Sequence, residues 1–361
     1  TRDIRFRGAY SRTERAPNVV ELFIPQTIQN GEYTDPCSGP TPLYSADVCY
    51  RTANLAAAGV SEAAFASNIY GQISPCPAGE CNEKVGGNTA LKPEIAYTTT
   101  LGFVFTPSFV PGLYASLDYW DIDLQNAIGT LPVTGILTGC YQDNIATLCD
   151  DIHRDPVNGT INGTQGFVSA ASQNLTSIHK RGWDVQADYM LRLGEHGLPD
   201  WGTINTDFVG TYLAHDYITV PVEGSYECAG LFGATCGQPT PRWRHKVRWT
   251  WATPWNVDLS LQWRYIAQVK VDVNSSNPIM NFGTPDIIDA KIPAYSYFDL
   301  AATWRIRDNL ILSGGVNNIF DKDPPVLDTL AFPIAQAPTN SWPAVYDALG
   351  RTIFINLTAK F

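Results

Sequence analysis

The strictest constraint in this sequence is a long run of alternating apolar and polar residues. In NVDLSLQWRYIAQVKVD, residues 256–272, an extended chain carries apolar side chains on one face and polar side chains on the other. The apolar set is Val257, Leu259, Leu261, Trp263, Tyr265, Ala267, Val269 and Val271. The run is about fifteen residues long, whereas strands of globular proteins typically have five or six. The pattern predicts one long strand over 257–271 with one wet face.

Similar alternation recurs along the chain and predicts an all-β fold. It is clear at 183–193, 294–306 and 352–361 and weaker at 95–105. The stretch 114–124 changes phase midway, which a β-bulge would explain. Ten strands are predicted, at 2–11, 94–106, 113–127, 173–193, 203–217, 241–253, 257–271, 294–306, 310–320 and 350–361.

The connections between these strands alternate between two lengths. Long ones (12–93, 128–172, 218–240, 272–293 and 321–349) alternate with short ones (107–112, 194–202, 254–256 and 307–309). All long loops should therefore leave one end of an antiparallel sheet, an asymmetry typical of outer-membrane barrels. A soluble sandwich also alternates, so the loop lengths decide between the two. In a bilayer the strands must belong to a closed barrel, because an open edge leaves backbone groups unsatisfied.

Composition agrees with a chain that has a large apolar surface. Charged residues are 16% of the 361 residues, against roughly 25% in an average soluble domain. No run approaches eighteen apolar residues, which excludes a helical membrane span. One helix is expected near 55–66, within a loop. The net charge of −11 and the pI of 4.8 argue against nucleic-acid binding.

The eight cysteines fall in the predicted loops as four close pairs. The pairs are Cys37 with Cys49, Cys76 with Cys81, Cys140 with Cys149, and Cys228 with Cys236. Eight cysteines allow 105 pairings, but adjacency within separate loops favours this one. Disulfides imply an oxidising location. A zinc site is the alternative, although no Cys-x-x-Cys and no nearby histidine pair supports it.

Basic residues gather on the polar face of one predicted strand. In PRWRHKVRWTW the residues Arg242, Arg244, Lys246 and Arg248 share a face, and Arg264 and Lys270 extend it on the next strand. In an acidic chain such a row suggests a path for an anionic ligand or a contact with an acidic plug. The alternative is pairing with carboxylates of the same face, namely Asp184, Asp188, Asp207 and Asp258.

Several separated motifs resemble one family of membrane proteins. They are FRGAYSRTERAPNVVELF (6–23), NTALKPEIAYTTTLGF (88–103), LDYWDIDLQNAIG (117–129), the stretch from Asn174 through KRGWD to Asp184, SGGVNNIFDKDPP (313–325) and YDALGRTIFINLTAKF (346–361). In this order they resemble TonB-dependent outer-membrane receptors. The resemblance implies that residues 1–361 are the C-terminal part of a transmembrane antiparallel β-barrel, about ten of 22 strands. The N-terminal plug and the earlier strands are then expected to be absent from this sequence.

The resemblance also implies a function and partners. The receptor would import a bulky, scarce ligand, a ferric siderophore or an oligosaccharide, through the outer membrane of a Gram-negative bacterium. TonB, with ExbB and ExbD, would supply energy through the plug, and no cofactor or metal would be needed. The terminal Phe361 resembles the signal read by the barrel assembly machinery; an ordinary apolar edge strand is the alternative.

The motif at 313–325 also has a physical interpretation. Small residues at 313–315 allow a strand to bend or to approach its neighbour closely. Phe320 is expected at a membrane interface, and Asp321–Pro325 is expected to begin an extracellular loop.

The alternatives to a receptor are an enzyme and a secreted binding protein. Motifs of hydrolases and phosphate-binding loops are absent from the sequence, so an enzyme is not expected. A secreted, disulfide-stapled β-rich lectin or adhesin would also alternate, and detergent dependence would distinguish it from a receptor. The connection 12–93 is rich in Tyr, Pro and Asn, which suits a glycan ligand as well as a siderophore.

Overall fold

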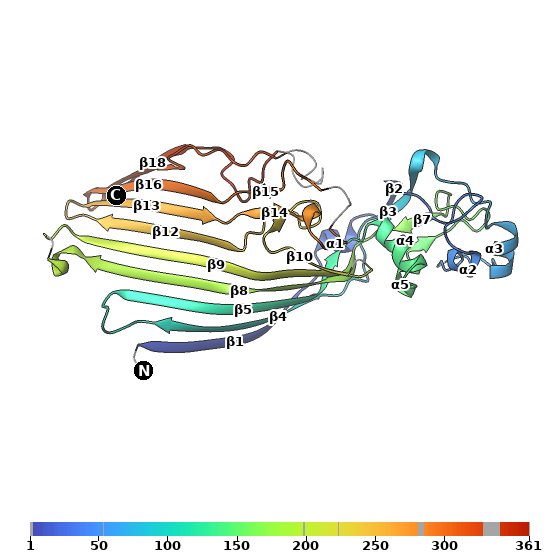
Figure 1. The fold of residues 1–361 in the computed structure, drawn as a ribbon, viewed down its shortest axis with the longest axis horizontal. Coiled ribbons are helices and arrows are strands. Elements are labelled where there is room, and N and C mark those ends of the chain that lie inside the picture. Colours follow the sequence, from blue (N-terminus) through green and yellow to red (C-terminus); the bar gives the residue numbers. More distant parts are fainter. Residues whose placement is uncertain are drawn as a thin grey trace.

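One large antiparallel sheet forms the wall of the molecule (Figure 1). The structure is a computed structural model and describes residues 3–52, 54–197, 199–222, 224–280, 285–327 and 340–360. Ten strands pair in chain order: β1 (Ile4–Arg15), β4 (Glu94–Phe105), β5 (Leu113–Gly129), β8 (Gln173–Arg192), β9 (Thr203–Val220), β12 (Trp243–Ala252), β13 (Val257–Ile266), β16 (Tyr295–Arg307), β17 (Leu310–Asn317) and β18 (Thr352–Ala359). Each of the ten predicted strands has a counterpart in this sheet, in the predicted order.

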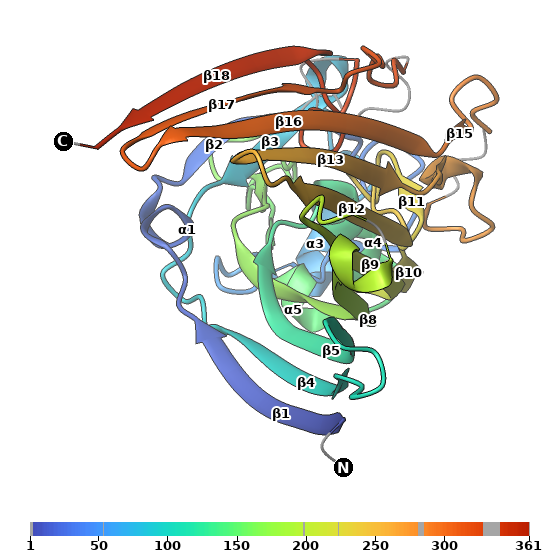
Figure 2. The same cartoon turned by 90° about the vertical axis from the view of Figure 1, so that its left-hand side faces the viewer.

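The sheet is curved, and its two ends differ. Short turns lie at one end with both chain termini, and the long connections extend from the other end, as predicted (Figure 1). Figure 2 shows the sheet curving around one face, with β1 and β18 as its edges. No helix of the described residues is long and apolar enough to cross a membrane.

Alternation gives the sheet an apolar outer face. Trp304, Leu312 and Leu357 lie side by side on three neighbouring strands. On β18, Ile353 is 73% exposed and Ile355 is 78% exposed. Large apolar side chains that face outward without partners suit a lipid environment and not water.

The predicted strand over 257–271 is wrong in one respect, because it is two strands. β13 ends at Ile266, and its pairing with the neighbouring strands β12 and β16 ends at the same residue. The chain then forms β14 (Val269–Val271), which pairs with β11 (Leu231–Phe232) and β15 (Lys291–Ile292) in a small separate sheet. Val269 and Val271 are buried there, so apolar alternation continues past the break and hides it.

The phase change expected within 114–124 lies slightly later. The register between β5 and β8 shifts between Leu124 and Ala127, and Asn126 has φ of +56°. Residues 115–125 pair regularly with β4. Asparagine tolerates the left-handed region better than most residues, which explains its place at the irregularity.

The two longest connections fold together into a body with its own core, which we call the loop cap (27–85 and 131–170). Its elements are β2 (Thr27–Glu32), α2 (Ala46–Cys49), α3 (Glu62–Asn68), η1 (Pro77–Gly79), β3 (Glu80–Val85), α4 (Val133–Tyr141), α5 (Ala146–Cys149), β6 (Ile152–His153) and β7 (Phe167–Ser169). Leu55, Phe65, Ile136 and Ile152 are fully buried in its core. The helix expected at 55–66 is α3, later than predicted.

Shorter elements complete the fold. They are α1 (Val19–Phe23) near the end of β1, η2 (Leu193–His196) in a short turn, β10 (Gly224–Glu227) beside β9, and η3 (Asp272–Asn274) after β14.

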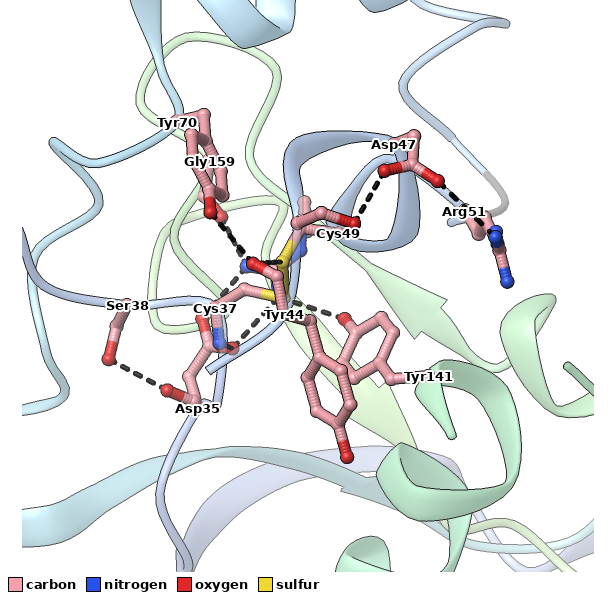
Figure 3. Close-up of a disulfide and its surroundings, with 12 residues drawn as sticks. Asp35, Cys37, Ser38, Tyr44, Asp47, Cys49, Arg51, Tyr70, Tyr141 and Gly159 are labelled. Atoms are coloured by element: carbon pink, nitrogen blue, oxygen red, sulfur yellow. Dashed lines mark hydrogen bonds and ion pairs between the residues drawn. A yellow bond between two sulfur atoms is a disulfide. The ribbon is translucent and has the colours of Figure 1, made fainter. Parts of the chain in front are cut away.

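Four disulfides join the cysteines in the pairs favoured by the sequence. They are Cys37–Cys49, Cys76–Cys81, Cys140–Cys149 and Cys228–Cys236, and among the described residues no cysteine is free. The zinc alternative is therefore wrong. Figure 3 shows the Cys37–Cys49 bridge in the loop cap, where Tyr44 packs on Tyr141 with ring centroids 5.5 Å apart.

We expect loss of the Cys140–Cys149 bridge to loosen the loop cap and leave the sheet folded. Closing a loop of this length stabilises by about 2–3 kcal/mol. Cys140→Ser with Cys149→Ser should therefore speed proteolysis of the loops of the full-length protein. The folded state of the sheet, seen as heat-dependent mobility on an unheated gel, should stay unchanged. Loss of that mobility would show that this disulfide is needed for the large sheet to fold, and would contradict the prediction.

The glycines of 313–325 have the predicted role. A Cβ atom on Gly315 would lie 2.6 Å from the Leu300 carbonyl oxygen and 2.7 Å from the Phe354 ring, so only glycine fits there. Phe320 is 71% exposed, and its ring meets Phe298 of the outer face edge-on at 5.5 Å. Its expected place at a membrane interface stays a prediction. Phe361 lies outside the described residues.

Candidate ligand-binding site

A cavity of about 370 Å³ opens on the inner face of the sheet, near the long connections. Its residues come from five strands and from two connections, and the inner face that carries them is the concave one. They are Trp120, Lys180, Thr211, Leu213, Asp216, Gln238, Pro239, Thr240, Pro241, Arg244, Ile266, Ala344 and Val345. Cavities of this size are typical of small-molecule sites.

A β-bulge in β9 shapes this cavity. Arg181 pairs with His215, but the next residue, Gly182, pairs with Leu213, so Ala214 is the extra residue. The extra residue exchanges the faces of β9 and brings Asp216 onto the concave side. The guanidinium of Arg242 donates a hydrogen bond to the carbonyl oxygen of Ala214 and holds the bulge.

Asp216 is a buried carboxylate within the cavity wall. It is 2% exposed, and its Oδ2 accepts a hydrogen bond from Lys180 Nζ at 3.0 Å. Its backbone NH donates to Glu227 Oε1 at 2.7 Å. Among the residues that the structure describes, none donates to Asp216 Oδ1. Lys180 thus neutralises the carboxylate but leaves one acceptor open.

Three basic side chains of β12 stand on the concave face. Arg244 lies opposite Thr211 and lines the cavity. Arg248 donates to Gln262 Oε1 on β13. Within the described ranges neither Arg244 nor Lys246 forms an ion pair with a carboxylate. The positive charge of this row is therefore available to a ligand or to another part of the protein.

The carboxylates expected to neutralise this row are engaged elsewhere. Asp258 pairs with Arg305, Asp184 accepts from Thr211 Oγ1 at 2.7 Å, and Asp207 accepts from Asn205 at 3.0 Å. Asp188 lies opposite Asp207. Among the described residues, the predicted pairing with the β12 cations is therefore wrong.

The two remaining predicted cations, Arg264 and Lys270, lie on different sheets. Arg264 of β13 forms ion pairs with Asp299 at 2.8 Å and with Asp347 at 2.6 Å, and so fastens the β17–β18 connection to the wall. Lys270 belongs to the small sheet of β14 and is exposed. Four of the six predicted residues, Arg244, Lys246, Arg248 and Arg264, thus share the concave face, while Arg242 supports the bulge.

Sequence reasoning missed Lys180, Asp216 and Trp120. All three meet at the cavity. The sequence around Asp216 does not show which face its side chain lies on, because the bulge at Ala214 interrupts the alternation of apolar and polar residues. No group of three or more His, Cys, Asp or Glu is placed to hold a metal ion in the part of the chain that the structure describes.

Comparison with solved structures gives the same fold. The chain matches a mutant of the ferric enterobactin receptor PfeA from Pseudomonas aeruginosa with a TM-score of 0.57 and 17% identity, over 100% of this chain and 38% of that one. It matches the siderophore receptor PirA from Acinetobacter baumannii with a TM-score of 0.55 and 15% identity, over 100% and 39%. The chain therefore spans less than half the length of these receptors. At such identity the likeness concerns the fold alone.

A family model decides the assignment. The model described as "TonB dependent receptor-like, beta-barrel" matches residues 1–319. No curated protein sequence matches the chain. The family is one of outer-membrane transporters and not of enzymes, and it displaces the alternative of a secreted lectin or adhesin. The chain belongs to the TonB-dependent receptor family, as part of its β-barrel domain.

Proposed function

We propose that this chain is the C-terminal part of a 22-stranded outer-membrane importer that takes up a scarce anionic ligand, with energy relayed from TonB, ExbB and ExbD through a plug. The ligand passes the long connections and binds in the concave cavity. The observation that carries this proposal is Arg244, a cation without an ion pair among the described residues, inside a cavity that Trp120 also lines. Charged hydrogen bonds and one flat aromatic face suit a bulky organic anion.

Between the two expected ligand classes, the loop cap favours a siderophore over a neutral oligosaccharide. The tyrosines that suggested glycan stacking mostly serve the core of the cap. Tyr33 is buried there and Tyr50 packs against the same core. Tyr70 donates its hydroxyl hydrogen to the Tyr44 carbonyl oxygen at 2.8 Å. Among the described residues, these tyrosines therefore offer little open ring surface to a sugar, whereas the cations of β12 stay open to an anion.

Uptake in cells tests the proposal. A strain that lacks the receptor gene is complemented with wild type, Arg244→Gln or, as a control at the short-turn end, Arg192→Gln. Loss of a charged hydrogen bond worth about 1.5–3 kcal/mol should lower siderophore-dependent iron uptake about tenfold or more for Arg244→Gln only. Normal iron uptake by Arg244→Gln, together with impaired growth on an oligosaccharide, would reverse the choice of ligand class.

The proposed location predicts which loops face the medium. Single cysteines placed at exposed sites of the loop cap, Ser67→Cys and Asp143→Cys, should react with a membrane-impermeant thiol reagent on intact cells. Cysteines in the short turns, Glu195→Cys and Trp255→Cys, should react only after the cells are broken. Labelling of the short turns from outside, with the cap protected, would contradict the orientation.

A further inference from the structure

Asp216 lines the cavity, and one of its two carboxylate oxygens accepts no hydrogen bond from the described residues. The side chain is almost fully buried, Lys180 occupies Oδ2, and Oδ1 has no donor among the described residues. A buried acceptor without a donor costs free energy, which a bound partner recovers. Since Asp216 lines the same cavity as Arg244, a ligand held in that cavity can supply the donor.

Asp216 and Arg244 recognise opposite kinds of group. A guanidinium only donates hydrogen bonds, and an ionised carboxylate only accepts them. Arg244 lies opposite Thr211, and Asp216 follows Thr211 past the bulge, so the two backbones are roughly 13 Å apart along the sheet at about 3.3 Å per residue. One ligand that touches both must carry an acceptor at one end and a donor at the other.

We propose that Asp216 is a specificity-determining residue that accepts a hydrogen bond from a hydroxyl or ammonium group of the ligand, whose anionic group binds Arg244. The inference rests on the proposed function and narrows the ligand to organic anions that also carry such a donor. The positive charge of Lys180 balances the negative charge of Asp216, so the carboxylate does not repel the anionic group of the ligand. A site built to bond a polar group rejects an analogue without it, because its own group is left unpaired.

Three matched probes isolate the donor. Hexanoate, 6-hydroxyhexanoate and 6-aminohexanoate share the carboxylate and the chain and differ only at the far end. Affinities are measured for the full-length receptor in lipid nanodiscs by ligand-observed NMR titration. The wild type should bind at least one donor-bearing probe about tenfold or more tightly than hexanoate, and which of the two it prefers separates hydroxyl from ammonium ligands.

Variants then assign the preference to Asp216. Asp216→Asn and Asp216→Ala should lower the affinity for the preferred probe to within about twofold of that for hexanoate. Asp188→Asn, on the same concave face but outside the cavity, should leave all three affinities unchanged. The asparagine variant keeps the shape of the side chain, so it carries the test if the alanine variant does not assemble, as judged on an unheated gel.

The outcomes separate this inference from the proposed function. Equal affinity of the wild type for the three probes, no binding of any probe, or unchanged preference in the Asp216 variants overturns the inference. If Arg244→Gln weakens all three probes while the Asp216 variants change nothing, the anion site stands and the role of Asp216 does not. If the Arg244 and Asp216 variants both leave binding unchanged, the proposed site fails as well.

Discussion

Arg154→Ala should unfold the loop cap while the sheet stays intact. Arg154 is fully buried, and its two terminal nitrogens donate to Asp35 Oδ2 and Oδ1, each at 2.8 Å. They also donate to the Gly159 carbonyl oxygen and to the Tyr141 hydroxyl, again at 2.8 Å. Removing one partner of a buried ion pair leaves the other charge uncompensated and costs about 3–5 kcal/mol. That loss is a large part of the stability of a whole domain, which is about 5–15 kcal/mol.

Limited proteolysis of the full-length receptor measures this effect. The loops of Arg154→Ala should be cut much faster than those of the wild type, while the barrel keeps its heat-dependent gel mobility. Arg51→Ala is the matched control, since Arg51 lies in the same cap but forms a partly exposed pair with Asp47, worth at most about 1 kcal/mol. Unchanged proteolysis of Arg154→Ala would mean that the wall and not the buried pair holds the cap together.

A double substitution separates charge from packing. Although burial alone lowers the pKa of Arg154, the nearby Tyr141 and Asp35 raise it overall, so the guanidinium stays charged. Arg154→Met with Asp35→Leu removes both charges together and fills similar space, and such replacements are often neutral or stabilising. This variant should resist proteolysis far better than Arg154→Ala. Equal loss in both would assign the effect to lost volume.

The wall was predictable because membrane-spanning strands have a strict chemical pattern. One face meets lipid and the other meets polar groups, so period-two alternation persists for ten residues or more. The loop cap lacks such a pattern. Seven of the nine residues of α4 (Val133–Tyr141) are buried, so the helix has no polar stripe to reveal its period. Its contacts with distant loops, which fix the fold of the cap, leave no local signal.

The site was predictable only in part, for a similar reason. The cations of β12 follow regular alternation, so their shared face could be read from the sequence. Asp216 could not be placed, because one extra residue at Ala214 reverses the faces of β9. Arg242 was misplaced because it lies just before β12 begins, where alternation no longer reports a face. Lys270 was misplaced because it belongs to β14, which pairs in the small separate sheet and not in the wall.

Ile355→Arg should strongly reduce the assembled receptor, whereas Asn356→Arg should assemble nearly normally. Ile355 points outward from β18 and is 78% exposed, and Asn356 lies on the opposite face, beside Ser313. An arginine that faces lipid near the midplane of the bilayer costs about 2–4 kcal/mol, and one in a polar lumen costs less.

The contrast between neighbouring positions makes this test specific to register. A shift of one residue would exchange the faces of β18, so Asn356→Arg would then be the damaging change. Both variants add the same side chain to the same strand, and general effects of charge on expression therefore cancel. Folded receptor is quantified on unheated gels of outer-membrane fractions. Equal levels for Ile355→Arg and Asn356→Arg would contradict a last strand with one face in lipid, because no other difference between the two positions predicts a preference of this size.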